Sequence, residues 1–189
     1  MNAPELIHEL EQFTRKHLGE VETLFELTAE QLNWRAEEGS WSILECIEHL
    51  NRYGDFYLPE IEQSMKTGNR KQPAIFKTGW LGNYFAKSML PKEKLNKMKT
   101  FKNMNPQGSQ LDRSVINKFK GQLETMLKLL DAAKEVDLTR TKTGISISNW
   151  IKLRLGDTFR VVIYHHERHL VQVKRVLSNS PAHTTSVSA

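Results

Sequence analysis

Apolar residues recur at steps of three and four along most of this chain, a spacing that places them on one face of an α-helix. The pattern predicts a first helix over residues 5–31 and a second over residues 42–67. Ser42 and Glu45 open the second helix with a capping-box pattern. Pro59 lies inside this helix, and we expect it to kink the helix or to end its first half.

A third helix is predicted after Ser109 and a last one from Gly156-Asp157 to about Leu177. Residues 69–108 form a long crossover between the second and third helices, with room for a short helix within residues 80–90. Polar, turn-like residues 139–149 and a short apolar stretch at 150–155 precede the last helix, and no convincing strand alternation is present. Three tryptophans are expected to be packing anchors: Trp41, Trp80 and Trp150.

Four long helices, one long crossover and otherwise short connections predict an all-α fold, specifically a four-helix bundle. We expect one domain over residues 1–177, since 189 residues are enough to bury a sizeable core. Residues 178–189 are rich in Ser and Thr and are expected to be a disordered tail.

Composition places the protein among ordinary globular proteins and predicts a cytoplasmic location. The chain has no run of about 18 apolar residues, so no membrane-spanning helix is expected. Its first residues lack the basic and apolar regions of a secretory signal. A single cysteine, Cys46, excludes an intramolecular disulfide and suits a reducing compartment.

The net charge of +5 is concentrated in one part of the chain. Residues 66–105 contain ten basic residues and one acidic residue, Glu93, whereas the remainder is net acidic. Such a segment could attract nucleic acid or an anionic substrate. Because no nucleic-acid-binding motif accompanies the charge, nucleic acid is not the expected partner, and a solvated connection is the simpler interpretation.

Histidines gather near the end of the chain, in Tyr164-His165-His166-Glu167-Arg168-His169. His165 and His169 are four residues apart, so on a helix both imidazoles lie on one face, close enough to share a metal ion. His49 on the second helix could supply a third nitrogen ligand. A helical wheel instead favours His166 with His169, so His166 is either a buried core residue or itself a ligand.

Two blocks of the sequence resemble the DinB/YfiT-like superfamily. They are Trp41-Ser42-x-x-Glu45-x-x-x-His49-Leu50 and, far downstream, His165-x-x-Arg168-His169-x-x-Gln172. The resemblance implies a four-helix bundle with up-down-down-up connectivity and a divalent metal ion held by His49, His165 and His169. It also implies a homodimer. Some members are thiol-dependent transferases that use low-molecular-weight thiols, and others are described as metal-dependent hydrolases.

Three neutral imidazoles would leave the charge of a divalent ion uncompensated, so an anionic fourth ligand is favoured. A bound water with a pKa of about 7 would give a hydrolase, and a bound thiolate would give a thiol S-transferase, each acting on a small molecule. Zinc, nickel, iron or manganese would suit this ligand set. The alternative is a non-catalytic bundle whose metal is structural and whose surface binds another protein. The sequence identifies no catalytic residue.

Residues near these motifs have simpler expected roles. Glu45 is expected to cap its helix, and Cys46 to be a small buried side chain and not a fourth ligand. On the helical wheel Glu167 faces away from the side of the metal ligands and towards solvent. Arg168 and Gln172 lie on the side of the metal ligands and could touch the site. Lysines of the crossover, such as Lys92, Lys94 and Lys97, could lie over the site and steer an anionic substrate.

Overall fold

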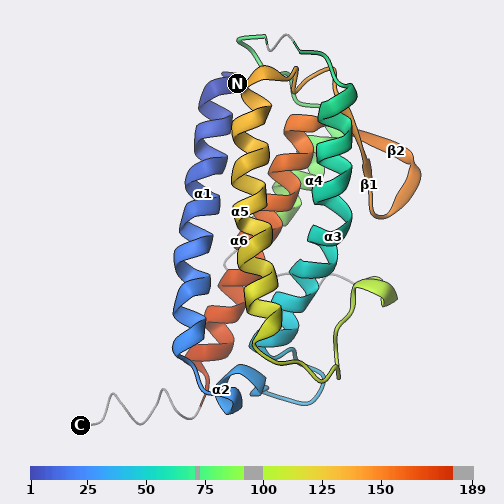
Figure 1. The fold of residues 1–189 in the computed structure, drawn as a ribbon. Helices are drawn as coiled ribbons and strands as arrows, with labels where there is room; N and C mark the ends of the chain where they lie inside the picture. Colours follow the sequence, from blue (N-terminus) through green and yellow to red (C-terminus); the bar gives the residue numbers. More distant parts are fainter. Residues whose placement is uncertain (71–72, 92–99, 181–189) are drawn as a thin grey trace.

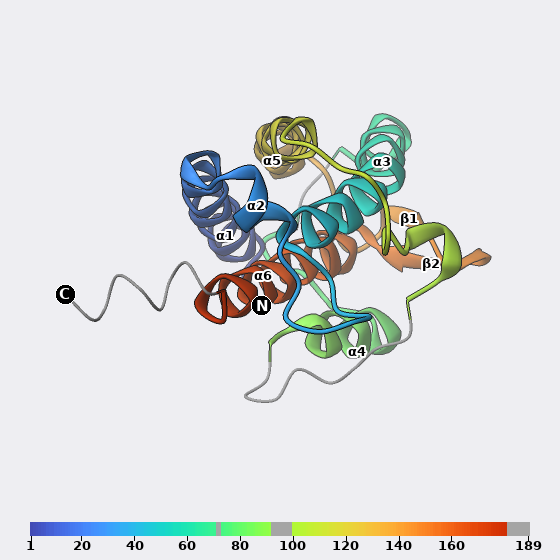
Figure 2. The same cartoon turned by 90° about the horizontal axis from the view of Figure 1, so that it is seen from below.

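The computed structural model describes residues 1–70, 73–91 and 100–180 of the chain. Four long helices lie side by side in it (Figure 1): α1 (Ala3–Thr23), α3 (Ile43–Thr67), α5 (Ser114–Ala132) and α6 (Leu155–Ser178). Both α1 and α3 pack against α5 and α6, as the view along the helices shows (Figure 2). Shorter elements complete the fold: α2 (Ala29–Asn33), α4 (Trp80–Met89), β1 (Lys142–Ile145), β2 (Ser148–Arg154) and the 3-10 turns η1 (Leu24–Glu26), η2 (Lys102–Met104) and η3 (Ala133–Glu135).

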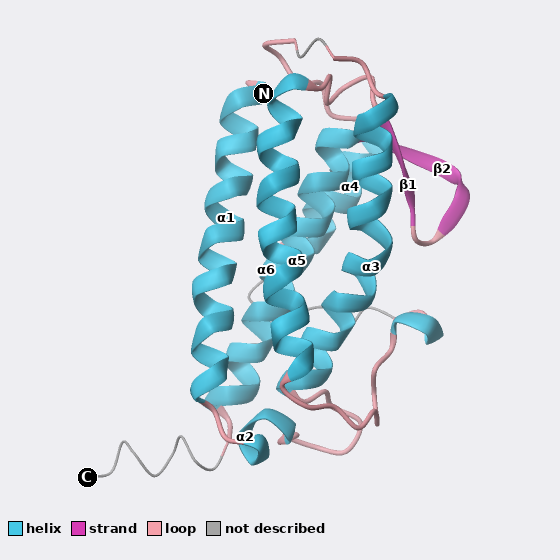
Figure 3. Cartoon of the chain, in the orientation of Figure 1, coloured by secondary structure: helices cyan, strands magenta, loops and turns pink. Residues whose placement is uncertain are grey.

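The prediction of a mainly α-helical protein is confirmed, and the short helix predicted within residues 80–90 is α4 (Figure 3). Within the described part of the chain, no helix is both long enough and apolar enough to cross a membrane. The predicted tail beyond residue 180 and the lysines of residues 92–99 lie outside the described residues.

The first helix is shorter than predicted. α1 ends at Thr23, and α2 begins only after Thr28. The Thr28 side chain accepts a hydrogen bond from the Gln31 backbone, and the Gln31 side chain accepts one from the Thr28 backbone. This capping box starts a new helix inside the predicted one, because it satisfies amides that a continuous helix would have bonded internally.

The region before the last helix contains a β-hairpin that the sequence analysis did not predict. β1 and β2 pair antiparallel, with Thr143 opposite Leu153 and an irregularity between Gly144 and Ile145. β1 has only four residues, and its one buried polar side chain, Thr143, masks the alternation that would identify a strand. The hairpin was missed because so short a pattern is indistinguishable from a polar turn.

Two helix details also differ from prediction. α5 begins at Ser114 and not directly after Ser109, and the Asp112 carboxylate accepts a hydrogen bond from the Ser114 amide where the helix begins. α3 runs through Pro59 to Thr67, so Pro59 does not end the first half of the helix, which was one of the two expected outcomes. The last helix lies where it was predicted, within one residue at each end.

The apolar interior consists of two clusters stacked along the helices. One cluster takes Ile61 of α3 and Phe159 of α6, and the other takes Leu50 of α3 and Leu170 of α6. Buried polar residues of α1, α3 and α6 occupy the level between them. The histidines singled out in the sequence therefore lie midway along the molecule.

Candidate metal centre

The start of α3 fixes the position of His49. The Ser42 hydroxyl accepts a hydrogen bond from the Glu45 amide at 3.2 Å, and the Glu45 carboxylate accepts one from the Ser42 amide at 2.8 Å. Glu45 also binds Arg35 at 2.8 and 2.9 Å and the Gly108 amide at 2.6 Å. Burial would raise the pKa of Glu45, but Arg35 and these amides hold that pKa below its usual value. The predicted capping role of Glu45 is confirmed.

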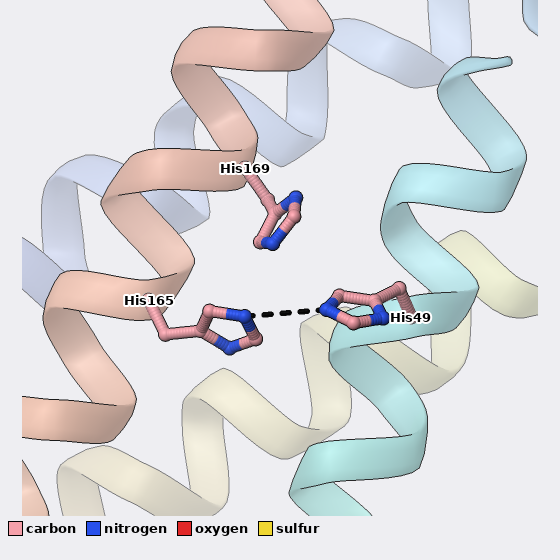
Figure 4. A group of neighbouring side chains, drawn as sticks. All are labelled: His49, His165 and His169. Carbon is pink, nitrogen blue, oxygen red and sulfur yellow. Dashed lines mark hydrogen bonds between the residues drawn. The ribbon is translucent and has the colours of Figure 1, made fainter. Parts of the chain in front are cut away.

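His49 on α3 faces His165 and His169 on α6 (Figure 4). The three side chains point towards one another from the two helices, and their residues are 3%, 9% and 8% exposed. One nitrogen from each ring can be chosen so that the three atoms all lie within 4.8 Å of one another. The structure thus brings together the three residues that the sequence analysis named as metal ligands.

The spacing of the imidazoles fits a shared metal ion. His49 Nε2 and His165 Nε2 are 3.2 Å apart. Two imidazole nitrogens at about 2.05 Å from one tetrahedral ion would be about 3.3 Å apart. The two rings therefore need little movement to bind a common ion. These three residues could hold a divalent metal.

Two of the three rings are oriented by hydrogen bonds at the opposite nitrogen. His49 Nδ1 donates to the Met104 carbonyl at 2.7 Å, and His169 Nδ1 donates to Gln172 Oε1 at 2.9 Å. A proton on Nδ1 leaves Nε2 as a lone pair, which is the form that binds a metal. His49 Nε2 has no proton to donate. The 3.2 Å contact between the Nε2 atoms of His49 and His165 therefore requires either a proton on His165 Nε2 or a cation between the two rings.

The electrostatic surroundings keep these imidazoles neutral. Burial and, to a smaller extent, the Arg52 charge lower the pKa of His49 to about 4, against the opposing effect of the bond to Met104. Burial and neighbouring positive groups also lower the pKa values of His165 and His169 well below 6.5. Neutral imidazoles are the form in which histidine ligates metals, so these directions suit a metal site.

Aromatic rings line the site. The Trp41 ring lies 4.7 Å from the His49 ring and 5.8 Å from the His169 ring, and Tyr53 lies 4.9 Å from His49 and 4.7 Å from His165, measured between centroids. Trp41 is thus a packing residue of the site. The same prediction is wrong for Trp80 and Trp150, which are 84% and 95% exposed. These two rings project from α4 and from the hairpin, where no buried face receives them.

His166 and Glu167 lie on the other side of α6. The His166 ring packs edge-on against Phe119, 5.2 Å away, and lies 6.0 Å from the His17 ring. Glu167 is buried and binds both Lys16 at 2.7 Å and His17 at 2.8 Å. The prediction that Glu167 faces solvent is wrong, because α1 covers this face and supplies the partners that make a buried carboxylate tolerable.

Other neighbours have the positions expected of them. Gln172 touches the site through His169, and Arg168 is buried and adds to the positive charge around the ligand pair. Cys46 is fully buried among apolar residues and is not in the group of potential ligands. Burial raises the pKa of its thiol. These facts agree with a core role for Cys46.

Sequence reasoning missed Met104 and Arg52. Met104 contributes its backbone carbonyl, a group that every residue has, so no sequence signal identifies it. Arg52 donates to the carbonyls of Asn103 and Asn105, at 3.3 and 3.0 Å. Its place on α3, three residues after His49, was the available signal. The steering role predicted for the lysines of 92–99 falls outside the described residues.

Comparison with known proteins gives one match. A family model described as the DinB superfamily matches residues 9–173, most of the chain and every residue of the candidate metal centre. No curated protein and no solved structure matches.

Proposed function

This chain belongs to the DinB superfamily, and we propose that it is a metal-dependent enzyme that binds one divalent ion through His49, His165 and His169. One observation carries the proposal: three buried, neutral imidazoles from two helices converge with the spacing that a shared ion needs. The family match supports it because the chain's His49 and His165/His169 blocks both lie inside the matched range.

The residues of the site have separable tasks in this proposal. His49 and His169 are held by Met104 and Gln172 so that their Nε2 lone pairs face the ion. The Trp41 ring packs against the His49 ring and the three histidines are buried, so water is excluded from the histidine rings. A bound divalent ion would supply Lewis acidity and would favour an anionic fourth ligand.

A catalytic ion is favoured over a structural one by the number and type of ligands. Structural zinc sites use four protein ligands and are rich in cysteine, whereas catalytic sites use three and leave one position for water or substrate. The group found within the described residues consists of three imidazoles. The alternative, a structural metal in a bundle that binds another protein, would require a fourth ligand from the protein.

The reaction remains a choice between two chemistries, a thiol S-transferase and a hydrolase, each acting on a small molecule. A low-molecular-weight thiol is the proposed co-substrate of the first. Zinc, nickel, iron and manganese are all compatible with three imidazoles, so the identity of the ion must be measured. Homodimer formation and a cytoplasmic location stay predictions.

The proposal extends to the topology of the helices. We place them in a four-helix bundle with up-down-down-up connectivity, which the superfamily resemblance implies. Its support is the run of colour in Figure 1, where α1 descends, α3 and α5 both ascend, and α6 descends again. Two successive parallel helices need a long connection, and residues 68–113 provide one between α3 and α5.

Elemental analysis of untagged protein, purified without chelators, tests the metal site. We expect near-stoichiometric divalent metal in the wild type and its loss in His49→Ala and in His169→Ala. The matched control is His8→Ala, which removes an exposed histidine of α1 and should leave the metal content unchanged. Wild-type protein that holds no ion after incubation with zinc, nickel, iron or manganese would refute the proposal.

Assays of thiol transfer and of hydrolysis on metal-loaded protein then separate the two chemistries. The same His49→Ala variant serves as the blank, because activity that survives it does not come from this site. The structural alternative would be favoured if the metal-loaded wild type is inactive in both assays and spectroscopy of the bound metal shows a fourth ligand from the protein.

A further inference from the structure

The segment Lys102–Gly108, here called the strap, is fastened along one face of α3 through its backbone. Its Met104 carbonyl accepts from His49 at 2.7 Å, and its Gly108 amide donates to Glu45 at 2.6 Å. Arg52 donates to two further carbonyls of the strap. Glu45, His49 and Arg52 are spaced by four and three residues, so they form one stripe along the helix.

Arg52 attaches the strap on both sides of the residue that His49 binds. One Nη1 atom donates to the carbonyls on both sides of Met104, Asn103 at 3.3 Å and Asn105 at 3.0 Å. Its Nε donates to Glu48 at 3.0 Å, which orients the guanidinium from one helical turn earlier. The bonds from Arg52 hold the strap on either side of the Met104 carbonyl, which accepts the hydrogen bond from His49.

We propose that Arg52 is a positioning residue for the metal centre, acting through the strap. Arg52 holds the Met104 carbonyl in place, this carbonyl holds the Nδ1 proton of His49, and the opposite nitrogen is thereby directed at the ion. The inference rests on the proposed function, because it assigns a role in metal binding to a residue that is not a ligand.

The sign of the effect separates positioning from simple electrostatics. Arg52 carries a positive charge near His49, and that charge lowers the pKa of His49. If charge alone mattered, removing it would reduce repulsion and tighten the binding of a divalent cation. If Arg52 acts through the strap, its removal frees the Met104 carbonyl and weakens binding, since losses of such outer contacts cost about 10–100-fold in metal affinity.

The test compares Arg52→Ala with the wild type and with Lys118→Ala. Lys118 is a matched control because it forms an exposed ion pair, at 2.7 Å, with Asp55 of the helix that carries Arg52, and this pair includes no residue of the strap. Zinc affinity is measured by competition with a chromophoric chelator. We expect the dissociation constant to rise about tenfold in Arg52→Ala and to stay within about twofold of the wild type in Lys118→Ala.

A second measurement needs no metal. Proton–nitrogen NMR of the metal-free protein, with the His49 signal assigned by its loss in His49→Ala, reports how fast the Nδ1 proton exchanges with solvent. In the wild type the bond to Met104 should make exchange slow, and in Arg52→Ala exchange should become at least about tenfold faster.

The two measurements separate the possible failures. Unchanged or tighter zinc binding in Arg52→Ala, with the His49 proton still protected, would overturn the positioning role and leave the metal site intact. A wild type without zinc affinity would refute the proposed function, whereas faster proton exchange in the variant would still support the strap.

Discussion

Histidines occupy two faces of α6, and the two faces treat them differently. On one face His165 and His169 meet His49 of α3, and their neighbours include two Nδ1 acceptors and the aromatic rings of Trp41 and Tyr53. On the other face the neighbouring residues His166 and Glu167 meet α1. Both groups lie at the polar level between the two apolar clusters.

Charge compensation distinguishes the two groups. His17 has a carboxylate partner, Glu167, which also binds Lys16, so the protein itself supplies a partner for Nε2 of this buried imidazole. The ligand face lacks such a carboxylate among the residues that shift the pKa of His49, His165 or His169. Converging imidazole nitrogens without a carboxylate partner suit a cation. Partners, and not histidine content, therefore distinguish the candidate metal site from the second face.

The largest expected effect comes from removing one histidine from each face of α6, either His165 or its neighbour His166. His165→Ala should lower zinc affinity by more than about 100-fold, because losing a ligand exceeds the loss of an outer contact. His166→Ala should leave zinc affinity within about threefold, yet lower the free energy of unfolding by about 2–4 kcal/mol through a cavity beside Phe119. Chelator competition and urea unfolding measure the two quantities. If His166→Ala abolished zinc binding, the helical wheel would have named the ligand correctly.

The pH dependence of stability gives His49 and Glu167 separate windows. In metal-free protein His49 has a pKa of about 4 against 6.5 in the unfolded chain, so the unfolded state takes up protons first. Stability should therefore fall as pH decreases from about 6.5 towards 4, by about 3 kcal/mol for His49 alone. Glu167 has a pKa of about 2, held down chiefly by the hydrogen bond from His17, so its contribution is lost only below about 4.5.

Urea unfolding of metal-free protein between pH 7.5 and 3.5 checks these windows. His49→Phe should make the decline between pH 6.5 and 4.5 shallower without abolishing it, because the lowered pKa values of His165 and His169 contribute there too. The decline below pH 4.5 should remain. A wild-type profile that is flat between pH 6.5 and 4.5 would show that the imidazoles titrate normally. The faces would then not differ in the way proposed.

Removing the carboxylate of the second face should have a smaller effect. Glu167→Ala leaves buried His17 without its partner, and we expect a loss of about 2 kcal/mol in the free energy of unfolding. Its zinc affinity should stay close to that of the wild type. Glu20→Ala is the control, since Glu20 pairs with Lys16 and Lys174 nearer the surface and should cost less than about 1 kcal/mol. Equal losses in both variants would mean that burial adds nothing to the Glu167 contacts.

The sequence predicted the elements whose patterns are long and local. α6 and the Ser42–Glu45 capping box depend on neighbours within a few residues, and both lie where they were expected. The triad was named because His165 and His169 share a helix face and His49 lies on another predicted helix. The family motif then selected His165 over His166. Helical geometry alone favoured His166, since a wheel records the direction of a side chain and not which helix receives it.

Features set by tertiary partners could not be predicted in this way. Glu167 is buried because α1 places Lys16 and His17 against it, about 150 residues earlier in the chain. The strap acts through the carbonyl of Met104, which carries no sequence signal. Trp80 and Trp150 are exposed although their side chains favour burial, because the hydrophobicity of a residue does not specify that a buried face will be available.

The smallest expected effect tests whether the ligand face needs its outer contacts. Gln172 accepts the Nδ1 proton of His169 at 2.9 Å from one turn along the same helix. Gln172→Ala should raise the zinc dissociation constant by about tenfold, or about 1.4 kcal/mol, while Gln172→Glu, which keeps an acceptor, should bind zinc at least as tightly as the wild type. Chelator competition measures both variants. Equal zinc affinities in all three proteins would mean that burial against Trp41 orients His169 without Gln172. Weak binding in Gln172→Ala together with wild-type affinity in Gln172→Glu would establish that a hydrogen-bond acceptor at this position holds the His169 ring for the ion.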